Sequence, residues 1–409
     1  MTGPGRLILP ALRWQEATGF SHEADTIARA LEFGAGGFIV FGGTAEAVRT
    51  LTAELDRRAG RRLLFAADLE RGAGQQFRGL TEFPPPAALT VLEDPAVIRW
   101  AGAVTAHEAR SVGVQWVLAP VADVDREPSN PIVQTRAFSA DARVAAAAVS
   151  EWIGACQRTG ALAAAKHWPG HGGTTSDSHD GLPVVAGDRA DLARDLTPFR
   201  AAVDAGVAAV MTAHVAFPGL DPSGLPATFS APILSMLRTE LGFEGAIVTD
   251  ALIMEGARGR GAGLAAVAAL AAGCDLLLYP DDPPAALTAI EDALDAGRLS
   301  RARVEGALAR YERLLARAIA PAPALPSTAP YGSTAELADR LLALPPIRGE
   351  PVSRLRSPIS LTIIDDDIGG RWPAGPTTWV EETLRSRGVP VAPGGRRIVL
   401  AFAEPRASK

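Results

Sequence analysis

The chain has 409 residues, of which 47% are hydrophobic and 21% are charged, and its formal net charge is -6. This composition provides ample material for a large core, and a single α/β domain can use about 250 residues or more. The acidic balance, without any cluster of lysine and arginine, disfavours nucleic acid as a partner. No segment approaches about 18 uninterrupted apolar residues, so we expect no membrane span.

Short apolar runs alternate with longer amphipathic segments along the first three quarters of the chain. The predicted strands are Leu7–Leu12, Gly37–Phe41, Leu63–Ala67, Trp116–Val121, Leu162–Lys166, Ala208–Ala213, Ala246–Thr249 and Asp275–Tyr279. The predicted helices are Glu23–Glu32, Ala45–Arg58, Pro95–Val112, Asp141–Thr159, Arg189–Ala205, Ala231–Leu241, Ala262–Ala272, Pro284–Ala296 and Arg301–Ala318. Eight strands, each followed by a helix, predict a (β/α)8 TIM-type barrel over residues 1–319. A doubly wound open sheet is the alternative, but no Gly-x-Gly-x-x-Gly fingerprint follows an early strand.

The composition changes after residue 319. Residues 320–334 are rich in proline, alanine and serine, which predicts a semi-rigid linker. Residues 335–409 contain a predicted helix, two predicted strands and a second predicted helix: Ala335–Leu344, Ile359–Ile364, Arg397–Phe402 and the neighbourhood of Trp379–Arg387. This small α/β segment is too short to bury a core of its own, so we expect it to pack on the barrel or on a partner subunit.

Two further features bear on the compartment. Cys156 and Cys274 lie in apolar segments, which predicts buried thiols rather than a disulfide and fits a reducing environment. The N-terminal segment has no charged region followed by a long apolar one, so we expect no signal peptide.

The segment Lys166–Pro183, KHWPGHGGTTSDSHDGLP, contains three of the six histidines. Its glycines and prolines exclude a regular helix, so it is predicted to be a loop at a strand end, where catalytic groups commonly lie. In an extended Asp177-Ser178-His179 the carboxylate can reach the imidazole, fixing its tautomer and raising its pKa. A simple turn with a solvated histidine explains the same residues equally well.

A metal site is a third interpretation of this loop, formed by His167 and His171 with Asp177 or His179. It would need a helical i, i+4 histidine pair, and Pro169-Gly170 interrupt that spacing. We therefore expect no metal and no cofactor.

Polar residues follow most of the other predicted strands as well. At one end of a parallel barrel, such residues meet and form the active site. They are Asp68 and Glu70, Asp123 and Asp125, Lys166 and His167, His214, and Asp250. Taken alone, Asp250 could simply cap the next helix, because aspartate is favoured there. The alternative is a carboxylate held at the barrel mouth as a nucleophile or base.

The loop sequence resembles the signature of the β-N-acetylglucosaminidases of glycoside hydrolase family 3, K-H-F-P-G-H-G-x-T-x-x-D-S-H-x-x-x-P. Two later segments, MTAHVAFPGLDPSGLPATFS and LRTELGFEGAIVTDALIMEGA, are similar to the segments that come after this signature in that family. The resemblance covers residues 36–278, with several motifs in the family's order.

The resemblance implies a role for each matching residue. Asp250 would be the nucleophile that forms a covalent glycosyl-enzyme, and His179, oriented by Asp177, would be the general acid/base. The implied substrate-binding residues are Asp68, Arg136, Lys166, His167, His214 and Met254. A histidine acid/base departs from the usual pair of carboxylates in retaining glycosidases, but it can protonate the leaving oxygen and then deprotonate water.

One position departs from the family pattern. Gln76 stands where the family often has an arginine near the substrate, and Arg71 or Arg78 is the possible substitute. A substrate with a negatively charged muramic moiety would miss that cation most. The C-terminal segment resembles only the start of the second domain of larger family members, so we expect activity not to depend on it.

These observations predict a retaining exo-β-N-acetylglucosaminidase that acts on small saccharides derived from peptidoglycan or chitin. The family implies a cytoplasmic enzyme of cell-wall recycling, with a saccharide as its partner, no nucleic acid and no membrane. Monomer and homodimer both stay open. The alternatives are a β-N-acetylglucosaminide phosphorylase, a β-glucosidase of the same family and a sugar-binding barrel without turnover.

Overall fold

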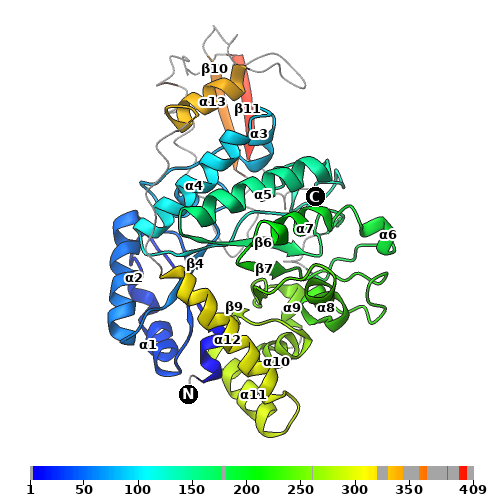
Figure 1. The fold of residues 1–409 in the computed structure, drawn as a ribbon. Coiled ribbons are helices and arrows are strands. Elements are labelled where there is room, and N and C mark those ends of the chain that lie inside the picture. Colours follow the sequence, from blue (N-terminus) through cyan, green and yellow to red (C-terminus); the bar gives the residue numbers. More distant parts are fainter. Residues whose placement is uncertain are drawn as a thin grey trace. The chain divides into compact units, whose positions relative to one another are not determined.

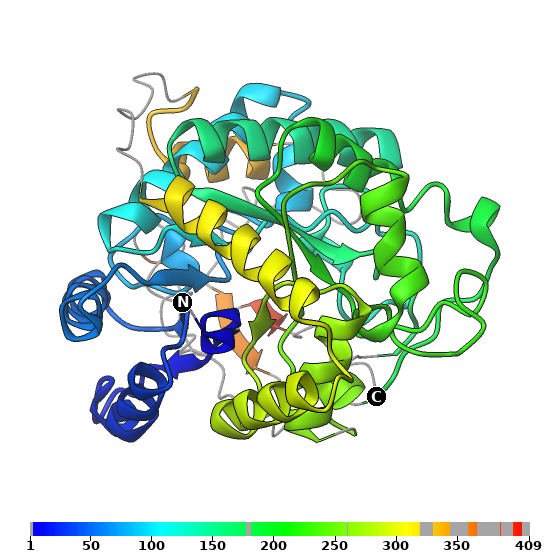
Figure 2. The ribbon, with the colours of Figure 1, turned by 60° about the horizontal axis from the view of Figure 1, so that its bottom comes forward.

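The structure is a computed structural model that describes residues 3–176, 181–259, 261–319, 330–343, 359–365, 385 and 396–402. The chain forms two compact units, Met1–Pro330 and Tyr331–Lys409. In the first unit, helices cover the outside of a curled sheet of parallel strands, as Figure 1 shows from one side and Figure 2 after a rotation. Its strands are β1 (Ile8–Leu9), β2 (Ala11–Arg13), β3 (Gly37–Phe41), β4 (Leu64–Ala67), β5 (Trp116–Val117), β6 (Leu162–Trp168), β7 (Ala209–Thr212), β8 (Ala246–Val248) and β9 (Leu277–Leu278).

The strands close into a ring. Strands β2 to β8 form one parallel sheet in chain order, and β1 pairs in parallel with β9. A parallel bridge between Val248 and Leu276 joins β8 to the segment that leads into β9. Pro10 separates β1 from β2, because proline has no N–H to donate, so the first predicted strand appears as two short ones. The predicted (β/α)8 barrel is confirmed.

The helices of the first unit lie between the strands as predicted, with small differences at their ends. They are α1 (Ala24–Glu32), α2 (Ala45–Ala59), α3 (Pro86–Thr90), α4 (Pro95–Ser111), α5 (Ala142–Arg158), α6 (Arg189–Leu192), α7 (Thr197–Asp204), α8 (Ala231–Thr239), α9 (Glu255–Arg258), α10 (Ala262–Ala272), α11 (Pro283–Asp295) and α12 (Arg301–Ala318). Side chains of the N-cap residues explain several starts: the Asp94 carboxylate accepts a hydrogen bond from the N–H of Ala96, and the Ser300 hydroxyl accepts one from Arg303.

Two helical predictions need correction. The single helix predicted over Arg189–Ala205 is two helices, α6 and α7, and Pro198 lies in the first turn of α7. Proline fits that turn but not a helix interior, so it forces the break. The short helices α3 and α9 were not predicted, because five and four residues are too few to show a periodic pattern.

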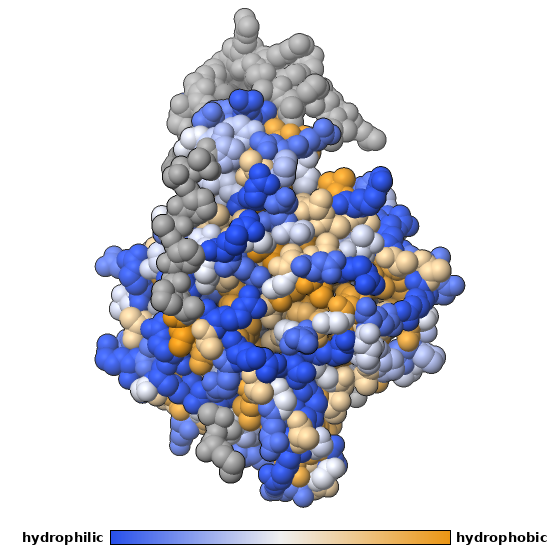
Figure 3. All heavy atoms as spheres, viewed as in Figure 1, coloured by the Kyte–Doolittle hydropathy of each residue, from blue (hydrophilic) through white to orange (hydrophobic). Residues whose placement is uncertain are grey.

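Helix α12 lies across the N-terminal ends of the strands. The Tyr311 hydroxyl donates to the carbonyl of Gly36, just before β3, and Arg310 pairs with Asp275, just before β9. In the view of Figure 1, α12 crosses in front of the strands, and Figure 3 shows hydrophilic side chains along it beside patches of apolar surface. This end of the barrel is therefore covered, which leaves the opposite end for the site.

The second unit contains α13 (Thr334–Ala343) and the parallel strands β10 (Ile359–Asp365) and β11 (Arg396–Phe402). These agree with the predicted helix and the two predicted strands. Residues 320–329 of the linker predicted over 320–334, and most of the helix predicted near Trp379–Arg387, lie outside the described residues. Cys156 and Cys274 are buried and unbridged, as predicted. In the described parts of the chain, no helix is long and apolar enough to cross a membrane.

Candidate active site

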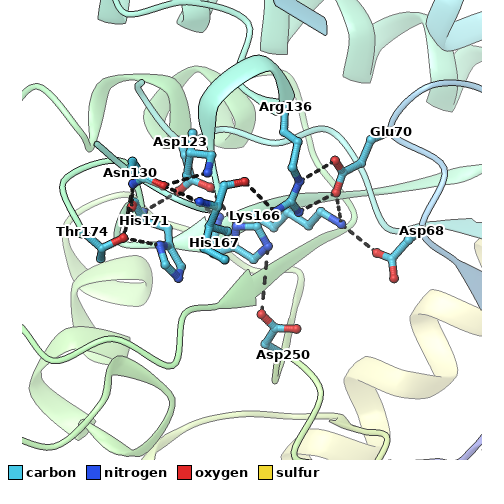
Figure 4. A network of polar contacts seen from close by, with 12 residues as sticks. Asp68, Glu70, Asp123, Asn130, Arg136, Lys166, His167, His171, Thr174 and Asp250 are labelled. Carbon is cyan, nitrogen blue, oxygen red and sulfur yellow. Dashed lines mark hydrogen bonds and ion pairs between the residues drawn. The ribbon is translucent and has the colours of Figure 1, made fainter. Parts of the chain in front are cut away.

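Most of the predicted polar residues meet at the C-terminal ends of the strands, and Figure 4 shows Asp68, Glu70, Asp123, Lys166, His167 and Asp250 there. Asp68 and Glu70 follow β4, and Asp123 follows β5. Lys166 and His167 come just before Trp168, the last residue of β6. Asp250 comes two residues after the end of β8. Side chains that are up to 182 residues apart in the sequence, from residue 68 to residue 250, therefore belong to one polar network.

Lys166 lies at the centre of the charged part of this network. Its side chain is 2% exposed, and Nζ lies 2.7 Å from Oδ1 of Asp68 and 2.7 Å from Oε1 of Glu70. Arg136 donates two further hydrogen bonds to Glu70, from Nε to Oε2 at 2.9 Å and from Nη2 to Oε1 at 2.8 Å. This bidentate geometry is the strongest arrangement of guanidinium and carboxylate.

The pKa values of these groups follow from the pairing. Burial alone would raise the pKa of Glu70, but Arg136 and Lys166 outweigh it and hold that pKa well below its usual value. Burial would likewise lower the pKa of Lys166, but Asp68 and Glu70 raise it overall. Glu70, Lys166 and Arg136 are therefore ionised at neutral pH, and they provide fixed donors and acceptors that can bind hydroxyl groups.

His167 is held by Asp123. Its Nδ1 lies 2.8 Å from Oδ2 of Asp123, whose other oxygen accepts the backbone N–H of His167 at 3.2 Å. Oδ1 of Asp123 also accepts the backbone N–H of His171 at 2.6 Å, so Asp123 acts as an acceptor throughout and Nδ1–H of His167 is the donor to it. Nε2 of His167 lies on the other side of the ring, 4.0 Å from Oδ2 of Asp250.

The described residues leave the Asp250 carboxylate largely available. It accepts a hydrogen bond from the backbone N–H of Ala251 at 2.7 Å, and the 4.0 Å separation from His167 is too long for another. Burial would raise the pKa of Asp250, but His167 and His214 in particular outweigh it, so the pKa lies below its usual value. Asp250 is not a helix cap, since α9 begins later, at Glu255, with Met254 as its N-cap.

His214 holds the residue that follows Asp250 by a hydrogen bond to its backbone carbonyl. It is fully buried, its Nε2 donates to the carbonyl of Ala251 at 3.1 Å, and its Nδ1 lies 2.7 Å from the Thr228 hydroxyl. Its ring nitrogens are thus already engaged, which makes it a neighbour that orients Asp250 more than a direct ligand of a sugar. Met254, 8% exposed, lies four residues beyond Asp250 and contributes an apolar side chain there.

The described part of the predicted loop is a compact turn. His171 donates its backbone N–H to Oδ1 of Asp123 at 2.6 Å, and its Nδ1 lies 2.9 Å from the Thr174 hydroxyl. Asn130 bonds the carbonyl of His171 at 2.9 Å. Burial, aided by His167, lowers the pKa of His171 to about 4, so this imidazole is neutral at physiological pH.

Asp177 and His179 lie outside the described residues, so their predicted roles stay predictions. The rings of His167 and His171 meet edge to face, with centroids 5.9 Å apart. Across the described ranges, no group of three histidine, cysteine, aspartate or glutamate side chains is arranged to hold a metal ion.

The predicted substitutes for the family's arginine are engaged elsewhere. Arg71 pairs with Glu82 at 3.3 Å, and Arg78 pairs with Glu16. The side chain of Gln76 accepts a hydrogen bond from the backbone N–H of Gly42 at 3.0 Å. Gln76 therefore fixes a neighbouring loop.

Glu70 and Asp123 have more important positions than the sequence indicated. Both were among the strand-end residues, but neither was assigned a role. Glu70 binds the two cations expected to contact substrate, and Asp123 fixes the tautomer of His167. Their partners lie 66 and 44 residues away, and only the position of each carboxylate at a strand end could have indicated them.

The arrangement defines a class of chemistry. The carboxylates of Asp68, Glu70 and Asp123 are each bonded to a cation or an imidazole, whereas Asp250 is anionic and, among the described residues, accepts only a backbone N–H. An available carboxylate beside donors for hydroxyl groups is what a barrel glycosidase needs for attack on a sugar.

Comparison with known proteins agrees with this class. Residues 27–314 match the Glycosyl hydrolase family 3 N terminal domain, and the chain belongs to this family of glycoside hydrolases. A β-hexosaminidase of Nitrosomonas eutropha is 36% identical over 66% of this chain and 82% of its own length. A β-hexosaminidase of Thioalkalivibrio sulfidiphilus is 39% identical over the same shares.

Solved structures similar to this chain include enzymes of the same family. A glycoside hydrolase family 3 β-N-acetylglucosaminidase from Paenibacillus sp. superposes with a TM-score of 0.82 and 30% identity, over 97% of this chain and 79% of that one. A β-N-acetylhexosaminidase from Beutenbergia cavernae superposes with a TM-score of 0.67 and 27% identity, over 76% of this chain and 97% of that one. A β-glucoside phosphorylase, at 21% identity and a TM-score of 0.80, shares the fold.

Proposed function

We propose that this glycoside hydrolase is a retaining exo-β-N-acetylglucosaminidase that removes a terminal, non-reducing β-linked N-acetylglucosamine. The observation that carries the proposal is the state of Asp250. Its carboxylate is anionic, accepts no hydrogen bond from a cationic side chain of the described residues and lies 4.0 Å from Nε2 of His167. The hexosaminidase relatives, similar over most of their length, support the choice of sugar.

In the proposed mechanism, Lys166, Arg136 and Asp68 bind the ring hydroxyls and fix the anomeric carbon above Asp250. The Asp250 carboxylate attacks that carbon as the glycosidic bond to the leaving oxygen breaks, which gives a covalent glycosyl-enzyme. His179, oriented by Asp177, supplies the proton to the leaving oxygen. It then takes a proton from the water that releases the sugar from Asp250.

The pairing of the other carboxylates at the barrel mouth supports the proposal that the general acid/base is a residue of another segment. Asp68, Glu70 and Asp123 are each held by a cation or an imidazole, so none of them is free to shuttle a proton. The loop that carries the family's Asp-Ser-His motif comes directly after the described turn and supplies the proposed histidine.

For the natural substrate we propose small fragments of peptidoglycan or chitin, acted on in the cytoplasm. Of these, uncharged chitin-type fragments fit better, because Gln76 bonds backbone and both Arg71 and Arg78 are paired with glutamates. A site built this way has fewer cations for a muramic carboxylate. Comparing turnover of a chito-oligosaccharide with that of a muramic-acid-containing disaccharide tests this choice; faster turnover of the latter would contradict it.

The central test is replacement of Asp250 by alanine. We expect hydrolysis of an aryl N-acetyl-β-glucosaminide to be lost while the circular dichroism spectrum and the melting temperature stay close to those of the wild type. Mass spectrometry of the wild type with a fluorosugar should show an adduct on Asp250. Near-normal turnover by the alanine variant would overturn the assignment.

A phosphorylase is the second candidate. The proposed acid/base is a histidine, which adds no negative charge to repel phosphate, and a β-glucoside phosphorylase shares this fold. Product analysis with and without phosphate distinguishes the two. A sugar 1-phosphate formed only with phosphate identifies a phosphorylase; free N-acetylglucosamine under both conditions identifies a hydrolase.

A further inference from the structure

A largely buried ion pair, Arg126 with Asp195, takes no part in the proposed mechanism. Nη2 of Arg126 lies 3.3 Å from Oδ2 of Asp195, with side chains 17% and 2% exposed. Arg126 is in the segment after β5, three residues beyond Asp123, and Asp195 is in the connection between α6 and α7. The pair therefore joins two segments that are 69 residues apart, counted from residue 126 to residue 195.

The turn of residues 170–173 fits between these two side chains. A Cβ atom added to Gly170 would come within 2.9 Å of Cβ of Asp195, and one added to Gly173 would come within 2.7 Å of Nε of Arg126. Gly170 also has a φ of 138°, which favours glycine, whereas a side chain at residue 173 would push the Arg126 guanidinium aside. Asp195 and Arg126 thus contact the two ends of the turn.

The same turn supports the sugar-binding histidine. The N–H of Gly170 donates to the carbonyl of His167 at 2.8 Å, and the N–H of His171 donates to Oδ1 of Asp123 at 2.6 Å. Asp123 in turn holds Nδ1 of His167. A shift of the turn would move the carboxylate that sets the orientation and tautomer of His167.

The pairing of Arg126 with Asp195 is incomplete. In the described parts of the chain, neither carboxylate oxygen of Asp195 nor Nε of Arg126 has a hydrogen-bond partner, although all three atoms are buried. Removing two charges from water costs free energy that such a pair does not fully repay. An incompletely bonded pair of this kind adds little net stability, and its position beside the turn points to a second role.

The charged neighbours of Asp195 make the pair sensitive to pH. Burial raises the pKa of Asp195 to about 6, Arg126 opposes this shift, Asp123 adds to it, and the exposed Arg194 weakly opposes it. Asp195 therefore ionises within the range where glycosidases are assayed. Below pH 6 its carboxyl group is neutral and no longer attracts Arg126.

We propose that Arg126 and Asp195 are positioning residues, which hold the turn of residues 170–173 and, through Asp123, keep His167 in its sugar-binding orientation. This inference rests on the proposed function, because it takes His167 to be a ligand of the substrate. Neither residue touches the substrate. The alternative is an ion pair that affects the stability of the fold alone.

The test is a pH profile of Asp195→Asn, which removes the charge and keeps the shape. At pH 7.5 we expect kcat/KM on an aryl N-acetyl-β-glucosaminide to fall roughly tenfold, the size expected for a small misplacement of a binding group. At pH 5 the difference should shrink to within about twofold, since Asp195 of the wild type is then protonated. Arg126→Gln should lose as much, and the double variant should lose no more than either single one.

Arg194→Gln is the matched control, because it removes a cation that lies beside Asp195 in the chain and only weakly affects its charge. It should stay within about twofold of the wild type at both pH values. Arg126→Lys, which keeps the charge, should recover part of the loss. Asp195→Asn with a pH profile parallel to that of the wild type, or with a loss that only follows its melting temperature, would overturn the inference. A wild type without hydrolysis would contradict the proposed function instead.

Discussion

Asp250 and Asp275 are two aspartates at opposite ends of neighbouring strands, and their surroundings differ in every respect. Asp275, fully buried before β9, accepts hydrogen bonds from Arg238 at 2.7 Å, Arg303 at 2.8 Å and the N–H of Ile247 at 2.9 Å. Asp250, after β8, is bonded by one backbone N–H and faces the site with 18% of its side chain exposed.

The comparison separates stability from reactivity. The acceptor positions of Asp275 are used to join α8 and α12 to the covered end of the barrel, so its charge stabilises the fold. The acceptor positions of Asp250 are mostly left open by the described residues, so its charge can act on a substrate. This agrees with the general division of a barrel into a stabilising end and a catalytic end.

The most direct test of this division between reactivity and stability is the same substitution at both aspartates. We expect Asp250→Asn to lower kcat on an aryl N-acetyl-β-glucosaminide by about 10⁴-fold or more, as for removal of other catalytic groups. The melting temperature should hardly change, since one hydrogen bond from Ala251 can be kept. Unaltered kcat would show that the available carboxylate is not the reactive one.

Asp275→Asn should give the opposite result. Loss of the charge leaves Arg238 and Arg303 partly buried without their anion, so we expect the free energy of unfolding to fall by about 3–5 kcal/mol. Urea denaturation measures this, and kcat per folded molecule should be unchanged. A stability equal to that of the wild type, or a selective loss of kcat, would mean that the two ends are not divided as described.

Glu70 is an intermediate case, since it lies at the catalytic end but is fully paired. Its pKa is lowered in the folded state, so its stabilising effect is present above the unfolded pKa of about 4.3 and is lost as the pH falls through the folded value. Glu70→Gln should cost about 1.5–3 kcal/mol at pH 7. The urea midpoints of the variant and the wild type should approach each other as the pH falls below about 4.3; a constant difference across pH would contradict the assigned charge.

Gln76→Arg should have the smallest effect. Restoring the cation that the family often has at this position should lower KM for a muramic-acid-containing substrate by about two- to fivefold, the effect of one exposed charge pair. KM for an uncharged chito-oligosaccharide serves as the control and should stay within about twofold, unless the loop held through Gly42 moves. Equal changes for both substrates would separate this position from recognition of charge.

The sequence predicted the strands and the strand-end residues well, because both depend on local patterns. Buried strands such as Gly37–Phe41 are apolar runs ended by glycine, and parallel strands place Asp68, Lys166 and Asp250 at one end without further information. The sequence did not predict which cationic side chain pairs with which carboxylate. The choice of Arg136 for Glu70 depends on distances across the barrel.

The helix break at Pro198 and the hydrogen bond of Gln76 show a second limit of prediction from the sequence. A proline in a helical pattern can begin a helix or interrupt one, and only the path of the chain between α6 and α7 decides. Gln76 stands where an arginine was expected, and nothing in its sequence neighbourhood indicates that its amide would bind the N–H of Gly42 instead.

The pairing of β1 with β9 has a consequence for the synthesis of this chain. Ile8 pairs with Leu277, 269 residues later by subtraction, so the N-terminal strand leaves the ribosome long before its partner exists. At about 5–20 residues per second the wait is roughly 15–50 s. During that time one edge of the growing sheet stays unpaired and open to other chains. The β1 edge of the sheet is therefore covered only after β9 has been synthesised.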